Sequence, residues 1–237
     1  EEYNVDYYLI DGSIYGDLQN PFPKGVETSA KAKKDLISAT LNDFEEMVKN
    51  PSDKSVYSPK LFNKYFKIYQ EHKYPYTLYL TTIERLVVLK EILKNSRKMI
   101  AISKSSSNND IFHSNMPDIA IFDKYTQKEG ISKVIRKKVS KDINTTFPVF
   151  DEFFKDLKFT IFYLRLADYK NVLKVELPYE ASMAEIEEIA TKLKKFSTNG
   201  YPYLLKKAHN DVVISDKNIK ELINIAKVRE KSGREML

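Results

Sequence analysis

The sequence contains no cysteine and only three histidines. Disulfide bonds, zinc–thiolate sites and cysteine nucleophiles are therefore excluded, as is a metal cluster built from several histidines. We expect a cytoplasmic protein, because the reducing cytoplasm is the simplest setting for a chain without cysteine. No run approaches the roughly 20 apolar residues that cross a bilayer, and no signal peptide is visible, so we expect no membrane association.

Several nucleotide-binding and hydrolase motifs are also missing. The chain has neither GxGxxG nor GxxxxGK[ST], so it shows no ATP-binding motor of its own. GxSxG and HExxH are absent too, which excludes the commonest hydrolase and metalloprotease signatures. The first residue is Glu1 rather than methionine, so we expect that an upstream segment is missing.

The residues that are present are typical of a globular α/β protein, with 42% apolar and 30% charged residues. The net charge of +6 is compatible with a polyanionic partner, although many proteins without one carry such a charge. Proline and glycine predict a loop at residues 16–25. Strands are predicted at residues 6–10, 98–102, 159–166 and 171–177, and helices at 29–48, 59–71, 81–95, 216–227 and from Ser182 to Asn199-Gly200. This mixture predicts a sheet with helices packed on its faces.

Asp11 is the first candidate for chemistry. It follows a predicted buried strand and begins the turn Asp11-Gly12-Ser13. A carboxylate held at a strand end suits Mg²⁺ or Mn²⁺, which position and activate water in phosphodiester cleavage. The alternative is a plain turn in which the aspartate accepts backbone N–H bonds.

Two further segments carry candidate groups. Ser103 and Lys104 begin a polar loop after a predicted strand and are candidates for binding substrate phosphates, although a solvated loop is the alternative. Tyr201 and His209 are eight residues apart near the C-terminal end, close enough to meet at one site. His209 could carry a proton or orient a water molecule near neutral pH, but a lone helical histidine is often structural.

The remaining candidates are single charged residues on strands and one basic run. Glu176 could add a carboxylate beside the site or form a strand-end salt bridge. Arg165 points opposite to its apolar neighbours and could contact DNA or solvent. The basic run at residues 133–141 suits a nucleic-acid backbone, but it could equally be a solvated face.

The order of these elements resembles the NurA nuclease family along most of the chain. The matching segments are YLIDGSIYG (8–16), MIAISKSS (99–106), PDIAIFDKYTQKEGIS (117–132), FYLRL (162–166), VLKVELP (172–178) and GYPYLLKKAHNDVVIS (200–215). The last segment is the most specific, because Tyr201 and His209 match the spacing of the family's tyrosine and histidine. The chain is expected to form one NurA-type domain over residues 1–237, with residues 17–95 as a mainly helical, aromatic-rich insertion.

The resemblance implies an RNase H-like mixed sheet flanked by helices and a Mn²⁺-dependent DNA nuclease, with Mg²⁺ as an alternative metal. Such an enzyme cuts single strands internally and degrades DNA ends from 5′ to 3′. It is implied to be a homodimer that works with a hexameric HerA-type translocase in double-strand-break resection. Carried over by position, Asp11 ligates the metal, and Tyr201 and His209 line the catalytic centre.

The chain departs from the family pattern in one respect. The family has two aspartates at strand ends with a glutamate between them, whereas this chain has a single clear Asp-Gly-Ser. We expect that Asp11 is the second aspartate and that the other carboxylates lie upstream of Glu1. In the alternative, Asp11 is the first aspartate and the others are among Glu84, Glu91 and Asp110.

Two other functional classes stay open at this stage. One is a non-catalytic scaffold that docks on DNA or a partner protein, with the aromatic-rich residues 57–79 as an interface. The other is an RNase H-like phosphodiesterase that acts on RNA. The scaffold should bind DNA regardless of EDTA and Asp11, and the phosphodiesterase should prefer RNA when both nucleic acids are offered.

Overall fold

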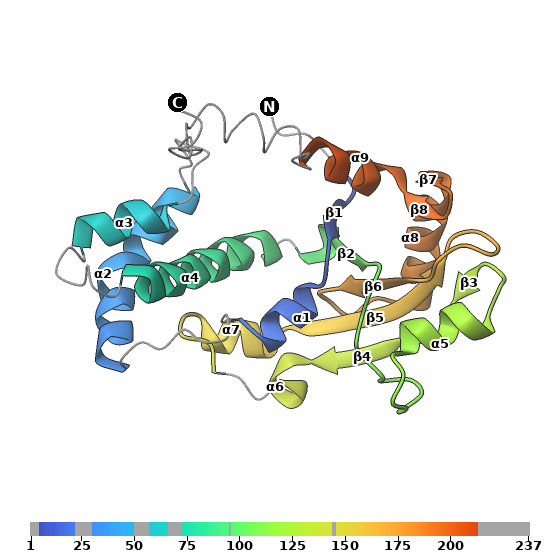
Figure 1. Cartoon of the computed structure of the whole chain (residues 1–237), viewed down its shortest axis with the longest axis horizontal. Coiled ribbons are helices and arrows are strands. Elements are labelled where there is room, and N and C mark those ends of the chain that lie inside the picture. The colour runs from blue at the N-terminus through green and yellow to red at the C-terminus, as the bar shows by residue number, and fades with distance from the viewer. Residues whose placement is uncertain are drawn as a thin grey trace, which may run out of the picture.

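The computed structural model describes residues 5–21, 30–49, 57–65, 73–94, 96–143 and 146–212. A mixed sheet forms the centre of the molecule, and a group of helices lies to its left in Figure 1. In chain order the elements are β1 (Tyr8–Asp11), α1 (Ile14–Gln19), α2 (Ala30–Lys49), α3 (Ser58–Tyr65), α4 (Lys73–Leu93), η2 (Ser96–Lys98), β2 (Met99–Ser103), α5 (Asp118–Tyr125), β3 (Gly130–Ile131), β4 (Ile135–Lys138), α6 (Val139–Asp142), α7 (Asp151–Asp156), β5 (Lys158–Arg165), β6 (Leu173–Leu177), α8 (Met183–Lys195), β7 (Ser197–Thr198), β8 (Tyr201–Pro202) and α9 (Tyr203–Val212).

The sheet has the strand order β1-β2-β6-β5-β3, and β4 pairs with the other end of β5. β1 and β2 are parallel, whereas the other neighbouring strands are antiparallel. β2, β6 and most of β5 are buried. The sequences of β2 and β5 are accordingly mostly apolar, whereas β6 carries the buried Lys174 and Glu176. The predicted α/β class, a mixed sheet flanked by helices, is confirmed.

Each face of the sheet packs against its own apolar core because strand side chains alternate between faces. On the α8 face, Ile102 and Val175 pack with Ile189 and Leu193 of α8. On the α1 face, Ala101 and Ile161 pack in the cluster that includes Tyr15 and Leu18 of α1 and continues into the helical group. The same alternation places the charged residues of β6. Its apolar residues Leu173, Val175 and Leu177 pack on the α8 face, so Lys174 and Glu176 lie on the α1 face.

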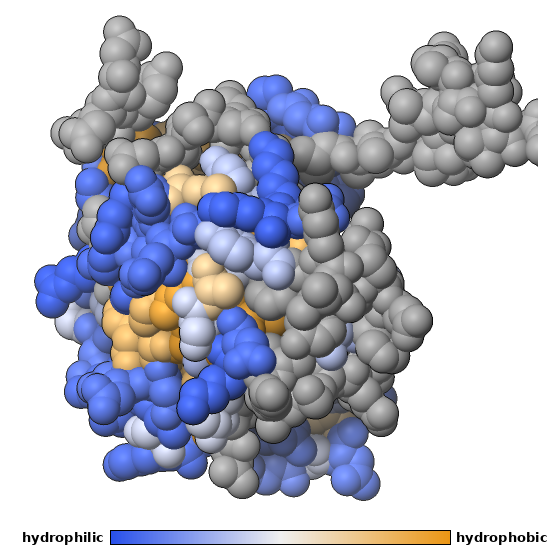
Figure 2. Space-filling model, turned by 90° about the vertical axis from the view of Figure 1, so that its left-hand side faces the viewer, coloured by the Kyte–Doolittle hydropathy of each residue, from blue (hydrophilic) through white to orange (hydrophobic). Residues whose placement is uncertain are grey.

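The chain between β1 and β2 contains α2, α3 and α4, which pack on one another. Glu84 of α4 fixes the start of α3, because its carboxylate accepts hydrogen bonds from the backbone N–H groups of Tyr57 and Ser58 at 2.8 and 2.9 Å. Seen end-on, this part of the molecule shows hydrophobic side chains among hydrophilic ones (Figure 2). Its interpretation as an insertion at residues 17–95 stays a prediction.

The boundaries of several elements differ from those predicted. β1 includes Asp11, whereas the predicted strand ended at residue 10. α4 begins at Lys73, so the predicted start at residue 81 is wrong. The hydroxyls of Thr81 and Thr82 donate to carbonyls four residues earlier, at 2.9 and 3.1 Å, so both residues lie within the helix. The helix predicted at residues 216–227 lies outside the described residues.

Candidate functional site

The turn after β1 holds Asp11 at the end of the parallel strand pair. Asp11 lies beside Ile102 of β2, and the N–H of Gly12 donates to the carbonyl of Ile102 at 2.9 Å. Gly12 has φ of 128°, a backbone conformation that side-chain-bearing residues rarely adopt. Ser13 then caps α1, because its hydroxyl accepts the N–H of Gly16 at 2.8 Å. The backbone at Asp11 is therefore held by its pairing with β2 and by the turn that follows it.

A buried ion pair supports this turn from the α1 face. Glu176 accepts hydrogen bonds from the Ser13 hydroxyl at 2.6 Å and the Tyr15 N–H at 2.9 Å. The Lys174 ammonium lies 2.7 Å from Glu176, and the two side chains are 2% and 0% exposed. Asp11 lies on the α8 face, because its register partner Ile102 packs there. Glu176 therefore positions the turn from the opposite face and does not join Asp11 as a second carboxylate.

Tyr201 reaches Asp11 from the other end of the described chain. Its hydroxyl lies 3.3 Å from Asp11 Oδ1 and donates to it across 190 residues of sequence. Burial and the neighbouring Asp11 carboxylate raise the pKa of Tyr201 to about 12, so the phenol keeps its proton at neutral pH. The preceding Gly200 has φ of 75°, and an added Cβ would lie 2.5 Å from Cβ of Lys170. Glycine at this position allows the short β7–β8 hairpin to present Tyr201 to β1.

Ser103 and Lys104 are adjacent in sequence but face different surroundings. The Lys104 ammonium lies 4.1 Å from the centre of the Tyr201 ring and is exposed. Ser103 is buried, is the register partner of Lys174, and its hydroxyl has no hydrogen-bond partner among the described residues. Of the two predicted phosphate-binding residues, only Lys104 is therefore beside Asp11 and Tyr201.

His209 lies on α9 with an exposed side chain. Helix α9 contacts β1, the strand that ends at Asp11. No hydrogen bond joins the two residues within the described ranges. The catalytic role of His209 stays a prediction.

Arg165 occupies a structural position. Its side chain is 5% exposed, and its guanidinium donates to the carbonyls of Thr126 at 2.9 Å and Phe122 at 3.3 Å. These carbonyls are at the C-terminal end of α5, where a cation stabilises a helix. Arg165 therefore caps α5, which does not support its predicted contact with substrate.

The described residues do not complete a divalent metal site. Glu84 caps α3, Glu91 pairs with Lys94 at 2.7 Å, and Asp110 pairs with Lys137 at 2.7 Å. None of these three carboxylates joins Asp11. Among the described residues, no group of three or more His, Cys, Asp or Glu side chains could hold a metal ion. In the described part of the chain, Asp11 contributes one carboxylate on the α8 face at this end of the sheet, whereas Mn²⁺ and Mg²⁺ take several oxygen ligands.

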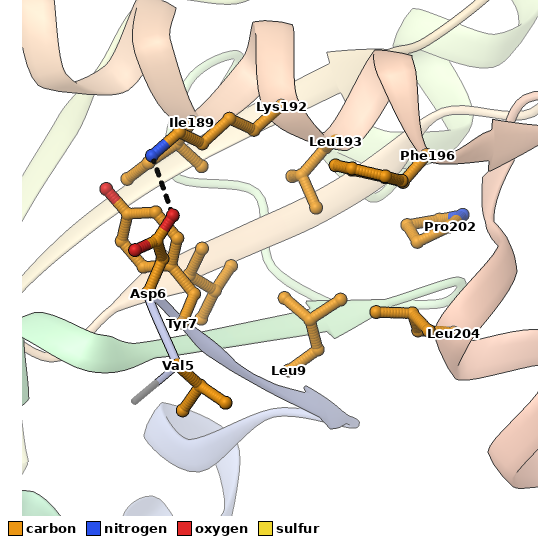
Figure 3. Close-up of a pocket in the computed structure, with 11 residues that line it drawn as sticks. Val5, Asp6, Tyr7, Leu9, Ile189, Lys192, Leu193, Phe196, Pro202 and Leu204 are labelled. Carbon is orange, nitrogen blue, oxygen red and sulfur yellow. Dashed lines mark hydrogen bonds and ion pairs between the residues drawn. The ribbon is translucent and has the colours of Figure 1, made fainter. Parts of the chain in front are cut away.

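An apolar groove of about 350 Å³ adjoins the Asp11–Tyr201 pair on the α8 face. Leu9 forms its floor, and Leu193 and Phe196 of α8 face Leu204 across it (Figure 3). Pro202, which follows Tyr201, lines the groove as well. No local sequence pattern marked this groove, because its walls come from strand β1, helix α8 and the start of α9.

The comparisons with known proteins agree with this arrangement. The sequence profile of the NurA domain matches residues 1–214. The probable DNA double-strand break repair nuclease NurA of Methanocaldococcus jannaschii is 29% identical over 261 residues, covering 100% of this chain and 62% of the relative. The DNA double-strand break repair nuclease NurA of Sulfurisphaera tokodaii is 31% identical over 226 residues, covering 94% and 59%. The chain thus spans about three-fifths of the length of these relatives.

Solved structures with the same fold belong to this group. The crystal structure of the NurA nuclease from Sulfolobus solfataricus aligns with a TM-score of 0.65 at 24% identity, covering 94% of this chain and 60% of that chain. A crystal structure of NurA bound to dAMP and manganese aligns with a TM-score of 0.58 at 16% identity, covering 94% and 70%. The structural likeness establishes the fold, and the profile match over most of the sequence establishes the family: this chain belongs to the NurA family.

Proposed function

We propose that this chain is the C-terminal, larger part of a metal-dependent DNA nuclease that degrades single strands and the ends of duplex DNA. The observation that carries the proposal is the contact between Asp11 and Tyr201, which joins the first strand to the last hairpin at the end of the sheet. Membership of a family whose relatives are named double-strand break repair nucleases supports this substrate class.

Each group at the site has a role that its surroundings support. Asp11 supplies one carboxylate ligand to Mn²⁺, or to Mg²⁺ in its place. Tyr201 holds Asp11 in position, because its protonated phenol donates to Oδ1. Lys104 offers a positive charge to the phosphate of the substrate beside the Tyr201 ring. The remaining metal ligands come from residues outside the described ranges, so we assign no catalytic step to the metal.

The wider assembly is also a proposal. By family membership we propose an RNase H-like fold, a homodimer and cooperation with a hexameric HerA-type ATPase in the cytoplasm. The helical group of α2, α3 and α4 lies to one side of the sheet (Figure 1), and we propose it as the contact surface for such a partner. Within the described part, no helix is long and apolar enough to span a membrane.

The replacement Asp11→Asn in the full-length protein tests the proposal. Asparagine keeps an oxygen acceptor for Tyr201 but loses the charge, so Mn²⁺-dependent degradation of labelled single-stranded DNA should fall at least about 100-fold. The matched control is Asp156→Asn, an exposed carboxylate elsewhere on the surface, which should leave the rate unchanged. Activity that survives Asp11→Asn would remove Asp11 from the mechanism.

The same preparation should be offered RNA of identical sequence. Faster cleavage of RNA would favour the phosphodiesterase hypothesis. A scaffold would be favoured if the preparation cleaves neither nucleic acid and binds DNA equally well with EDTA and with Asp11→Asn.

A further inference from the structure

We infer that the apolar groove beside Asp11 holds one unpaired nucleobase of the DNA strand whose phosphate lies at Asp11 and Lys104. This inference rests on the proposed function and adds a base-binding subsite to it. Such a subsite would make the enzyme act on single strands. The bases of a duplex are stacked and paired, so they cannot enter a pocket unless they are flipped out.

The groove and the Asp11–Tyr201 pair are continuous. Leu9 and Asp11 are two residues apart on the same face of β1, which places their Cα atoms about 7 Å apart. Tyr201 and Pro202 are consecutive residues of β8, one in contact with Asp11 and the other in the groove wall. A nucleotide with its phosphate at Asp11 therefore has the groove within reach of its base.

The walls of the groove suit a flat aromatic ring. Phe196 at the end of α8 is 60% exposed, and Leu204 at the start of α9 is 58% exposed. Figure 3 shows Phe196 and Leu204 on opposite sides of the groove, with Leu193 beside Phe196 and Leu9 on the side of Leu204. A base inserted between Phe196 and Leu204 would cover both, and stacking on an aromatic side chain tolerates any base.

The charges around the groove indicate a nucleic acid rather than an apolar protein segment. At one end Asp6 and Lys192 form an ion pair at 3.4 Å, which limits the groove on that side. At the end near Asp11, the Lys104 ammonium lies on the Tyr201 ring. Lys195 lies beside Phe196, with its ammonium 5.9 Å from the centre of the ring. Lys104 beside Tyr201 and Lys195 beside Phe196 therefore offer positive charge to phosphates near the groove.

The experiment compares two ligands of equal charge. The full-length protein, in EDTA to prevent cleavage, is titrated into a fluorescently labelled single-stranded DNA and into the same oligonucleotide with abasic sites throughout. Phe196→Ala should weaken binding of the normal strand about 5- to 150-fold, the effect of losing one stacked base, and leave abasic binding within twofold. Phe196→Tyr should retain normal affinity.

Met183→Ala is the matched control, since Met183 is an exposed apolar residue at the other end of α8. It should leave both affinities unchanged. Equal weakening of both ligands by Phe196→Ala, or no effect on either, would overturn the base-binding subsite. A change from dimer to monomer on light scattering would also overturn it, because the groove would then be an interface between copies.

The two proposals can fail separately. If Asp11→Asn leaves cleavage intact while Phe196→Ala selectively weakens the normal strand, the groove binds a base and the nuclease mechanism is wrong. If Asp11→Asn abolishes cleavage and Phe196→Ala does not distinguish the two ligands, the nuclease stands and the groove has another occupant.

Discussion

Replacing Glu176 with glutamine tests whether the buried Lys174–Glu176 ion pair holds the turn that follows Asp11. The glutamine side chain has nearly the same shape but carries no charge, so Lys174 loses its counter-ion in surroundings where it is 2% exposed. Glutamine also offers one good acceptor where the carboxylate offers two, so either the Ser13 hydroxyl or the Tyr15 N–H loses its partner. The change therefore weakens both the core of the α1 face and the support of Asp11.

The size of the effect follows from burial and distance. At 2.7 Å and an effective dielectric constant near 20, the attraction between the two charges is about 6 kcal/mol. Desolvation of both groups offsets much of this gain, but removal of one partner leaves the other charge buried alone, which costs about 3–5 kcal/mol. We expect Glu176→Gln to lower the free energy of unfolding by that amount. For a chain of this size, the melting temperature should fall by roughly 6–20 °C.

Urea unfolding followed by circular dichroism measures the loss in free energy of unfolding, and a double-mutant cycle shows how much of it comes from the Lys174–Glu176 pair. Lys174→Met alone should also be costly, whereas the double replacement should cost less than the sum of the two, because neither charge is then buried alone. A coupling energy of at least about 2 kcal/mol is expected. Additive losses, or a loss below about 1 kcal/mol for Glu176→Gln, would refute the role of the pair.

Two further predictions concern Tyr201 and Arg165. Folded Tyr201 keeps its proton up to about pH 12, whereas an unfolded tyrosine loses it near 10.0, so its contribution to stability is complete below pH 10 and is lost as the pH rises through about 12. The difference in unfolding free energy between wild type and Tyr201→Phe should therefore be the same at pH 6 and pH 9 and should shrink only above pH 10. Calorimetry measures this difference, and a change between pH 6 and pH 9 would contradict the raised pKa of Tyr201. Arg165→Met should lower the melting temperature, because α5 loses the bonds to Thr126 and Phe122, while the affinity for single-stranded DNA stays within twofold. Weaker DNA binding at an unchanged melting temperature would restore Arg165 as a substrate contact.

Patterns that depend on neighbouring residues were predicted well from the sequence. Ser182 was predicted to begin α8, because serine is a favoured helix cap. The structure confirms this, since the serine hydroxyl accepts the N–H of Glu185. The strand that became β2 was predicted from a compact buried-strand pattern, and the strands that became β5 and β6 were predicted as a pair joined by a short connection. α1 was missed, because Gly16 and the prolines that follow predicted a loop, whereas Ser13 and the buried side chains of Tyr15 and Leu18 stabilise a short helix.

The candidate site was only partly accessible to local patterns. The contact between Asp11 and Tyr201 was expected from the order of family segments, since nothing in either local sequence predicts a partner 190 residues away. The position of Glu176 could not be predicted, because its partners Ser13 and Tyr15 lie more than 160 residues away along the chain. The burial of Arg165 could not be predicted, because alternation indicates the face of a strand but not whether a helix covers that face.

The distance in sequence between Asp11 and Tyr201 has a consequence for the newly made protein. A ribosome that adds 5–20 residues per second needs about 10–40 s to make the chain between them. Throughout that interval Asp11 has left the tunnel without the phenol that holds it in place. The hydrogen bond that holds Asp11 therefore forms only when synthesis is nearly complete, and until then the newly made strand β1 ends in a carboxylate without its phenol partner.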